Sequence, residues 1–166
     1  MNQLYEVFVA AAKTTSVIMF LVAAAGVSAW LITVADMPAK MIELLEPFMG
    51  NKILLMFAIM VLVMAVGTAM DMTPTILILT PVLMPVVKAA GIDPIYFGVL
   101  FIVNNAIGLV TPPVGMNAFV VARYTGRPVD EVFAGVLPHV IAHVLLIALL
   151  VAFPAIVMWL PSTMMK

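Results

Sequence analysis

Charged residues divide the chain into long uncharged segments, and the lengths of these segments predict how each one lies in a membrane. Twenty-two uncharged residues separate Lys13 from Asp36. A helix of that length rises about 33 Å, which is enough to cross a hydrocarbon core of about 30 Å. We therefore predict a transmembrane helix over residues 14–35. The polar connection that follows, residues 36–52, contains a short amphipathic stretch that we expect at the membrane interface.

The next two uncharged segments are shorter and meet at Asp71. Eighteen uncharged residues precede Asp71, and only sixteen lie between it and Lys88. Sixteen residues reach about 24 Å as a helix, less than a full crossing. We predict a re-entrant hairpin over residues 53–88, with its turn at residues 71–74 and its tip at depth, where protein or water must satisfy the open backbone groups. Two tilted full spans joined by a surface turn are the alternative.

The segment between Pro94 and Arg123 combines membrane-spanning length with residues that interrupt a helix. It holds 28 uncharged residues, among them the pair Pro112-Pro113. Two consecutive prolines remove two amide donors, and the first also drives the residue before it away from helical angles. The sequence therefore predicts a broken helix over residues 95–124, whose first half ends near Leu109 and whose second half restarts around Val114. The interruption falls close to the bilayer centre.

The C-terminal segment reads as one further transmembrane helix, over residues 127–166. Its start carries Asp130 and Glu131, where a helix N-terminus favours negative charge. The apolar stretch after them is longer than one crossing needs, and Pro154 predicts a kink in it. The fold class is therefore all-α integral membrane, with a region 1–52, a hairpin and broken helix over 53–126, and this last helix.

Composition supports a membrane protein and excludes several functional classes. Apolar residue types make up 66% of the chain and charged types only 9%, against about 25% charged in soluble domains. The formal net charge of −1 leaves no basic field for nucleic acid, so the lipid bilayer is the expected surrounding and nucleic acid is not a partner. No paired carboxylates, Ser-His-Asp order, nucleotide loop or HExxH motif occurs. We therefore do not expect an enzyme, nor an organic cofactor.

Two interruptions carry the residues that are able to bind an ion. The segments 67–75 and 104–117 both combine helix-breaking residues with Thr, Asn or Asp side chains. Where a helix unwinds, carbonyl oxygens lose their amide partners and become available as ligands. An all-oxygen site suits a hard cation such as Na⁺, and helix ends inside a membrane hold ions and anionic substrates in secondary transporters. The alternative is that these glycines and prolines serve only close packing and kinks.

Single ionisable residues in the apolar segments leave several roles open. Asp71 can ligate a cation, relay a proton, or cap the helix that begins at Thr73-Pro74. His139 and His143 are four residues apart, a spacing that can chelate a metal, but no carboxylate accompanies them. We therefore expect a packing or interfacial role for the two histidines and no metal other than Na⁺.

Two longer strings resemble a known family. GTAMDMTPTILILTPVLMPVVKAAGIDPIYFG and NNAIGLVTPPVGMNAFV are similar to the C-terminal part of the large membrane subunit of TRAP (tripartite ATP-independent periplasmic) transporters, as is AAKTTSVIMFLVAAAGVSAWLIT nearer the N-terminus. The resemblance implies a multi-pass protein of the bacterial inner membrane that imports small carboxylates or sugar acids with sodium. It also implies two partners, a small membrane subunit and a periplasmic substrate-binding protein, and an elevator mechanism built on inverted repeats.

The resemblance also implies which residues bind ion and substrate. Sodium ligands are expected from the hairpin tip and the unwound loop, at Gly67, Thr68, Asp71, Thr73, Gly108, Thr111, Pro112 and Gly115. Substrate contacts are expected at Asn104 and Asn117. The family's first repeat has no counterpart here, so we expect the C-terminal half of a large subunit that needs the missing N-terminal half. The alternatives are a non-transporting assembly protein or gene remnant, and proton coupling through Asp71.

Overall fold

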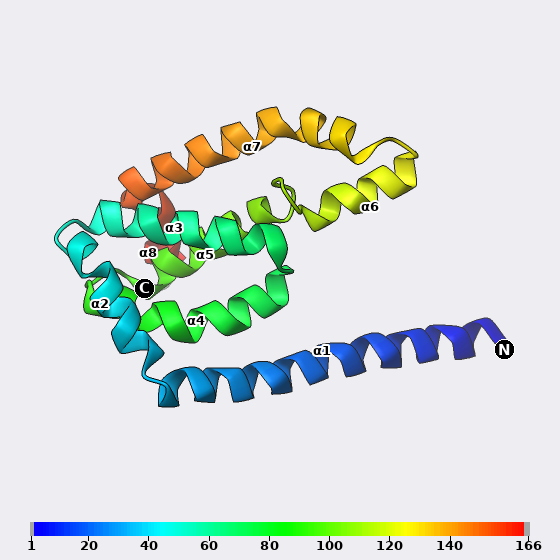
Figure 1. The fold of residues 1–166 in the computed structure, drawn as a ribbon, viewed down its shortest axis with the longest axis horizontal. Coiled ribbons are helices and arrows are strands. Elements are labelled where there is room, and N and C mark those ends of the chain that lie inside the picture. The colour runs from blue at the N-terminus through cyan, green and yellow to red at the C-terminus, as the bar shows by residue number, and fades with distance from the viewer. Residues whose placement is uncertain (1, 165–166) are drawn as a thin grey trace.

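The computed structural model describes residues 2–164 as eight α-helices, with no β-strand among these residues (Figure 1). The helices in chain order are α1 (Asn2–Val34), α2 (Met37–Met49), α3 (Lys52–Ala69), α4 (Met72–Ala89), α5 (Pro94–Gly108), α6 (Met116–Thr125), α7 (Val129–Ala152) and α8 (Pro154–Met164). Most predicted elements are therefore present, and the differences lie at their ends.

Four helices are long and apolar enough to cross a membrane. They are α1 over Leu4–Val34, α3, α4 and α7, while α5 is apolar but shorter. The chain is thus a multi-pass membrane protein. The first helix begins at Asn2 and not at residue 14 as predicted, because Lys13 lies inside the helix without ending it. In Figure 1, α1 leaves the body of the molecule and runs alone toward the N-terminus.

The predicted polar connection is a separate amphipathic helix, α2. Ile42 and Phe48 pack against the core and Leu45 belongs to it, whereas Lys40 and Glu43 are exposed. Asp36, which links α1 to α2, adopts left-handed backbone angles with φ 55°, so the chain turns sharply there. The amphipathic prediction is confirmed, and the position of α2 at a membrane interface stays a prediction.

The predicted hairpin is formed by α3 and α4, with Met70 and Asp71 as its turn. The turn precedes the predicted position, because α4 already begins at Met72 and Pro74 lies in its first turn. A proline is tolerated there, since the first amides of a helix have no intrahelical acceptor. Each arm has 18 residues, so length alone permits a full crossing as well as a re-entrant path. The re-entrant path therefore stays a prediction.

The core of the molecule forms where α5 packs on both arms of the hairpin. The arms make few contacts with each other, and α5 contacts both of them. Phe97 and Phe101 of α5 stack with ring centroids 5.4 Å apart and are almost completely buried, as is Leu100 between them. Burying side chains of this size stabilises a soluble core by roughly 1.5–3 kcal/mol each, whereas in lipid the gain comes mainly from dispersion and close packing.

The C-terminal segment, predicted as one transmembrane helix over residues 127–166 with a kink, contains one helix of membrane-spanning length, α7, followed by the shorter helix α8. α7 ends at Ala152 and α8 starts at Pro154, where a kink was predicted. Pro154 has no amide hydrogen to donate to the carbonyl of Leu150 four residues earlier. The hydroxyl of Tyr96 lies 3.2 Å from the carbonyl oxygens of both Leu150 and Val151 and satisfies this helix end. α8 then folds back on α5 and α7.

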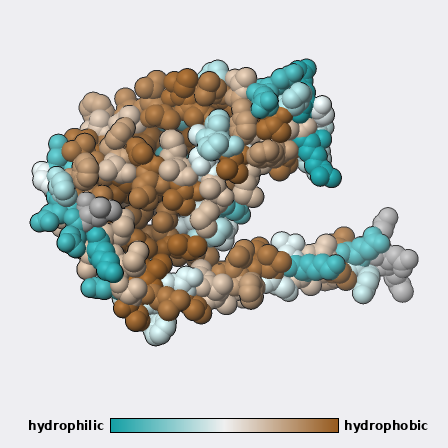
Figure 2. Space-filling model, viewed as in Figure 1, coloured by the Kyte–Doolittle hydropathy of each residue, from teal (hydrophilic) through white to brown (hydrophobic). Residues whose placement is uncertain are grey.

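Hydrophilic side chains gather at two ends of the molecular body and along the free part of α1, and leave an apolar surface between them (Figure 2). One end is formed by α2 and the start of α3, with Lys40, Glu43 and Lys52 exposed. The other is the corner between α6 and α7, where Arg127 and Glu131 form an ion pair of 3.0 Å on the surface. The α3–α4 turn and the break between α5 and α6 lie between these ends in Figure 1.

Candidate functional site

The hairpin tip and the helix break touch each other through two glycines. A Cβ atom added to Gly108, at the end of α5, would lie 2.7 Å from the carbonyl carbon of Gly67 and 2.9 Å from its Cα. Contacts of that length with backbone atoms leave no room for any side chain. The two helices therefore approach backbone to backbone, at the ends where both are about to unwind.

A hydrogen bond joins the next residue of the tip to the far side of the break. The amide of Gly115, which precedes α6, donates to the carbonyl oxygen of Thr68 over 3.2 Å. Gly115 has φ 46°, a left-handed conformation that glycine adopts without a steric penalty. A Cβ at this position would also lie 2.9 Å from the ring of Phe133 and 3.0 Å from the carbonyl oxygen of Thr111. Only glycine fits, so tip and break are locked in register.

Several carbonyl oxygens of the tip and of the break have free lone pairs. Among the described residues, the carbonyls of Gly67, Thr111 and Pro112 accept no backbone hydrogen bond. The Thr111 hydroxyl donates to the Ile107 carbonyl over 2.7 Å, and the Thr68 hydroxyl donates to the Ala65 carbonyl over 2.8 Å. Each hydroxyl oxygen therefore keeps lone pairs for a cation. Hard cations prefer oxygen ligands, so these groups have the chemistry of a hard-cation site.

Four of the predicted residues, Gly67, Thr68, Gly108 and Gly115, meet in the seam between tip and break, and Thr111 and Pro112 lie in the break itself. Asp71, Thr73 and Asn117 are exposed beside it. Asp71 occupies the N-cap position of α4, but its carboxylate accepts no capping hydrogen bond within the described chain. Of the roles left open for Asp71, capping is thus met by position but not by a side-chain hydrogen bond, and the Asp71 backbone carbonyl accepts the hydroxyl of Thr75 at 2.7 Å.

Two adjacent asparagines are completely buried beside the seam. Asn104 donates its amide to the Met60 carbonyl over 2.6 Å, and Asn105 donates to the Met72 carbonyl over 3.4 Å. Asn104 was predicted to contact substrate, but it has no exposed surface and holds α5 against α3. Asn105 was not among the predicted site residues. Two consecutive amides in an otherwise apolar run are a sequence signal that could have pointed to it, since buried polar groups need partners.

Comparison with known proteins then identifies the family. The profile described as "Tripartite ATP-independent periplasmic transporter, DctM component" matches residues 1–156. The chain belongs to this family. The TRAP resemblance seen in the hairpin and the break is thus confirmed over nearly the whole chain.

Individual TRAP permeases support the assignment. The chain is 51% identical, over 93% of its length, to the 2,3-diketo-L-gulonate TRAP transporter large permease protein of Escherichia coli K12, of which it covers 36%. It is 32% identical to the sialic acid TRAP transporter large permease protein of Vibrio cholerae and 29% identical to the C4-dicarboxylate TRAP transporter large permease protein of Pseudomonas aeruginosa. These two matches each cover 95% of this chain and 37% of the relative. The chain therefore spans little more than a third of these relatives.

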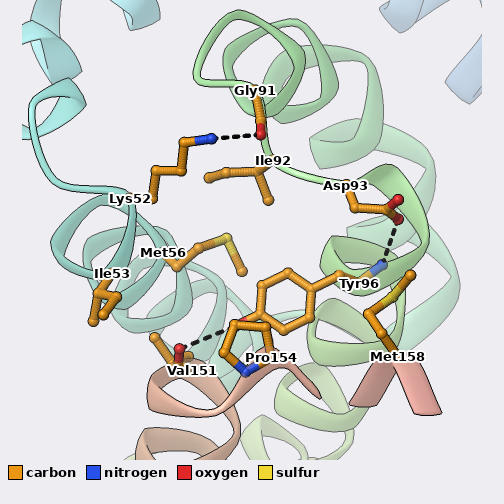
Figure 3. A pocket seen from close by; sticks show the side chains of 10 residues that line it. All are labelled: Lys52, Ile53, Met56, Gly91, Ile92, Asp93, Tyr96, Val151, Pro154 and Met158. Atoms are coloured by element: carbon orange, nitrogen blue, oxygen red, sulfur yellow. Dashed lines mark hydrogen bonds between the residues drawn. The ribbon is translucent and has the colours of Figure 1, made fainter. Parts of the chain in front are cut away.

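This TRAP permease chain has a cavity and a groove, and both lie away from the residues predicted to bind ion or substrate. A cavity of about 190 Å³ lies at the opposite end of α5, between Lys52, Tyr96 and Pro154 (Figure 3). There Lys52 donates through Nζ to the Gly91 carbonyl over 2.9 Å, which ties α3 to the loop before α5. A shallow groove of about 570 Å³ separates α1 from α4. Neither hollow is lined by a residue predicted to bind ion or substrate.

The two histidines of this TRAP permease chain do not form a metal site with a third ligand. Within the described residues, no group of three or more His, Cys, Asp or Glu side chains converges. His139 and His143 are both exposed on α7, and Nδ1 of His143 lies 2.8 Å from the carbonyl oxygen of His139. The sulfur-rich and imidazole ligands that transition metals prefer are thus not gathered in this part of the chain.

Proposed function

We propose that the chain is a membrane component of a sodium-coupled TRAP importer, and that Na⁺ binds where the hairpin tip meets the helix break. The observation that carries this proposal is the contact between Gly67 and Gly108, supported by the hydrogen bond from Gly115 to Thr68. Both bring unwound backbone from two parts of the chain to one place in the apolar body. Such ends hold coupling ions in other membrane transporters.

The proposed sodium ligands are oxygen atoms of the seam and of the residues next to it. Backbone carbonyls of Gly67, Thr111 and Pro112 have free lone pairs among the described residues. Asp71 is the second residue of the turn between α3 and α4, and its carboxylate is exposed. We propose that this carboxylate supplies the negative charge that balances the bound Na⁺. The full proposed set is Gly67, Thr68, Asp71, Thr73, Gly108, Thr111, Pro112 and Gly115.

The proposed substrate is a small carboxylate or sugar acid. The relatives named above carry 2,3-diketo-L-gulonate, sialic acid and C4-dicarboxylates in their names, and all are acids. Asn117 is exposed in the first turn of α6, where the helix N-terminus favours an anionic group. We therefore assign substrate contact to Asn117.

The proposed assembly contains more than this chain. We infer that a small membrane subunit and a periplasmic binding protein act with it in a bacterial inner membrane. The hairpin is proposed to be re-entrant and to form one of two inverted repeats of an elevator. Because the chain covers only 36% of the Escherichia coli relative, it is proposed to supply one wall of the substrate site and not to catalyse uptake by itself.

Thermal unfolding of the purified chain in lipid nanodiscs tests the sodium site. A ligand that binds only the folded state raises stability, by about 2.7 kcal/mol at a hundred times its Kd. We expect Na⁺ to raise Tm in a saturable manner, while K⁺ and choline at equal ionic strength do not. Equal Tm values in all three salts would argue for the alternative, a membrane assembly protein that keeps the packing and binds no ion.

A further inference from the structure

Asn105 links α5 to the hairpin at a specific point, the first residue after the turn. Its side chain has no exposed surface, and Nδ2 donates to the Met72 carbonyl over 3.4 Å. Asn105 lies three residues before Gly108, in the last turn of α5 before the break. The bond therefore connects the last turn of one helix to the first residue of another across the proposed ion site.

The oxygen of the same side-chain amide lies close to Gly67, on the α3 side of the turn. Among the described atoms Oδ1 of Asn105 has no hydrogen-bond partner, and it would lie 2.7 Å from a Cβ built on Gly67. The oxygen therefore occupies the space that a side chain at position 67 would need. One side chain thus bonds to Met72 and packs against Gly67, on the two sides of the turn.

Asn104 provides a comparison within the same helix. It is buried to the same extent, and its Oδ1 also lacks a hydrogen-bond partner among the described atoms. Its Nδ2, however, donates to the carbonyl of Met60, seven residues before Gly67 and about 10 Å along α3. Asn104 therefore fixes α5 on the middle of α3, whereas Asn105 fixes it on the tip.

We propose that Asn105 is a positioning residue for the sodium site. It holds residues 67–72 in register with the break, so that carbonyls from the two segments face the same ion. This role rests on the proposed function, and it adds a residue that need not touch the ion. A small change in register moves several ligands at once, and sites of this kind lose affinity when the supporting residues are loosened.

The direct test compares Asn105→Ala with Asn104→Ala in the full chain, in nanodiscs, by sodium-dependent Tm. Both variants remove a buried amide, so both are expected to unfold at a lower temperature without sodium. Only Asn105→Ala is expected to raise the sodium concentration of half-maximal stabilisation, by about tenfold, while Asn104→Ala stays within about twofold. Equal sodium midpoints in the two variants would overturn the proposal.

A second pair of variants guards against loss of folding. In Asn105→Ser and Asn104→Ser the shorter side chain cannot reach the other helix, and its hydroxyl can bond to the carbonyl four residues earlier in α5. The same difference in sodium midpoint is expected between them. If the wild-type chain shows no sodium response, the positioning role fails together with the proposed sodium site.

A double-mutant cycle tests the contact itself without using sodium. Gly67→Ala places a methyl group 2.7 Å from Asn105 Oδ1, while its other nearest contacts, to Asn105 O and Gly108 Cα, are 3.4 and 3.5 Å. Gly67→Ala is therefore expected to lower Tm in the wild-type background and to be tolerated in Asn105→Ala. Strictly additive changes in Tm would show that Asn105 does not hold the tip.

Discussion

Gly67 and Gly108 lie so close together that a methyl group on Gly108 would stand 2.7 Å from the carbonyl carbon of Gly67. The first glycine belongs to the last turn of α3, and the second ends α5. Neither has a side chain to separate the two backbones, so the tip and the break lie in direct backbone contact. The proposed ion site depends on this approach.

Gly108→Ala is expected to destabilise the chain strongly. The added Cβ would meet three backbone atoms of Gly67 at 2.7 to 3.0 Å, and backbone cannot rotate away as a side chain can. Forcing extra volume into a packed contact costs about 1–3 kcal/mol or more. Thermal unfolding of the purified variant measures this, and the sodium response is expected to be lost with it.

Gly98→Ala is the matched control in the same helix. A Cβ at Gly98 meets nothing within 4 Å, and alanine favours the helix by roughly 0.5–1 kcal/mol. This variant is expected to unfold at the wild-type temperature or slightly above it. A loss of stability in Gly98→Ala equal to that in Gly108→Ala would contradict the close-contact explanation.

Gly115→Ala is expected to destabilise the chain by more than the cost of placing an alanine in the left-handed conformation. The Cβ would collide with the Phe133 ring at 2.9 Å, and the left-handed conformation itself costs about 1–2 kcal/mol for a residue with a side chain. Gly126 has φ 68° but open space around its Cβ position, so Gly126→Ala isolates the backbone cost. Tm is expected to fall further in Gly115→Ala, and similar values in both would refute the clash.

Tyr96→Phe is expected to destabilise the corner between α7 and α8. The phenol oxygen is the donor that reaches the carbonyls of Leu150 and Val151, and leaving buried carbonyls unsatisfied costs about 1–3 kcal/mol. Tyr124→Phe is the control, because Tyr124 is 87% exposed. Unfolding in increasing denaturant measures the free energy of unfolding of both variants, which should be lower for Tyr96→Phe. Equal values would show that water can replace the Tyr96 hydroxyl.

Asp71→Asn separates sodium coupling from proton coupling. The carboxylate is exposed and makes no capping bond within the described chain, so we expect wild-type stability without sodium. The amide keeps one oxygen but loses the charge, so the sodium midpoint should rise about tenfold while full stabilisation is still reached. Proton coupling predicts instead that acidification stabilises the wild-type chain without sodium, and that Asp71→Asn abolishes this effect.

The spacing of charges and prolines predicted most of the helices because each of these residues acts locally. Pro112-Pro113 interrupts the helix whatever its surroundings, because the missing amide donors are a property of the two residues themselves. In the structure α5 ends at Gly108 and α6 begins at Met116, close to the predicted Leu109 and Val114. Pro154 likewise predicted the kink. The length of the last apolar segment was less informative, because α8 folds back on α5 and α7.

The candidate site was predicted only in part. The two segments that hold it were found because glycine, proline and threonine in an apolar run change the local backbone and leave oxygens free, whereas the individual ligands were expected from the family resemblance. Asn105 and Tyr96 were not assigned their roles, since each role depends on a carbonyl far away in sequence, at Met72 and at Leu150. No local sequence pattern indicates which distant carbonyl will accept the hydrogen bond.

The sequence by itself determined that this chain lies in a membrane, roughly where most of its helices lie and are interrupted, and which family it resembles. Those properties follow from apolar length, from missing amide donors and from the order of the residues. Only the tertiary structure decided that Gly67 meets Gly108, and that Asn105 reaches both ends of the tip. The reason is physical: a backbone contact without side chains depends on how three helices pack together, and packing is set by the whole core around Phe97 and Leu100.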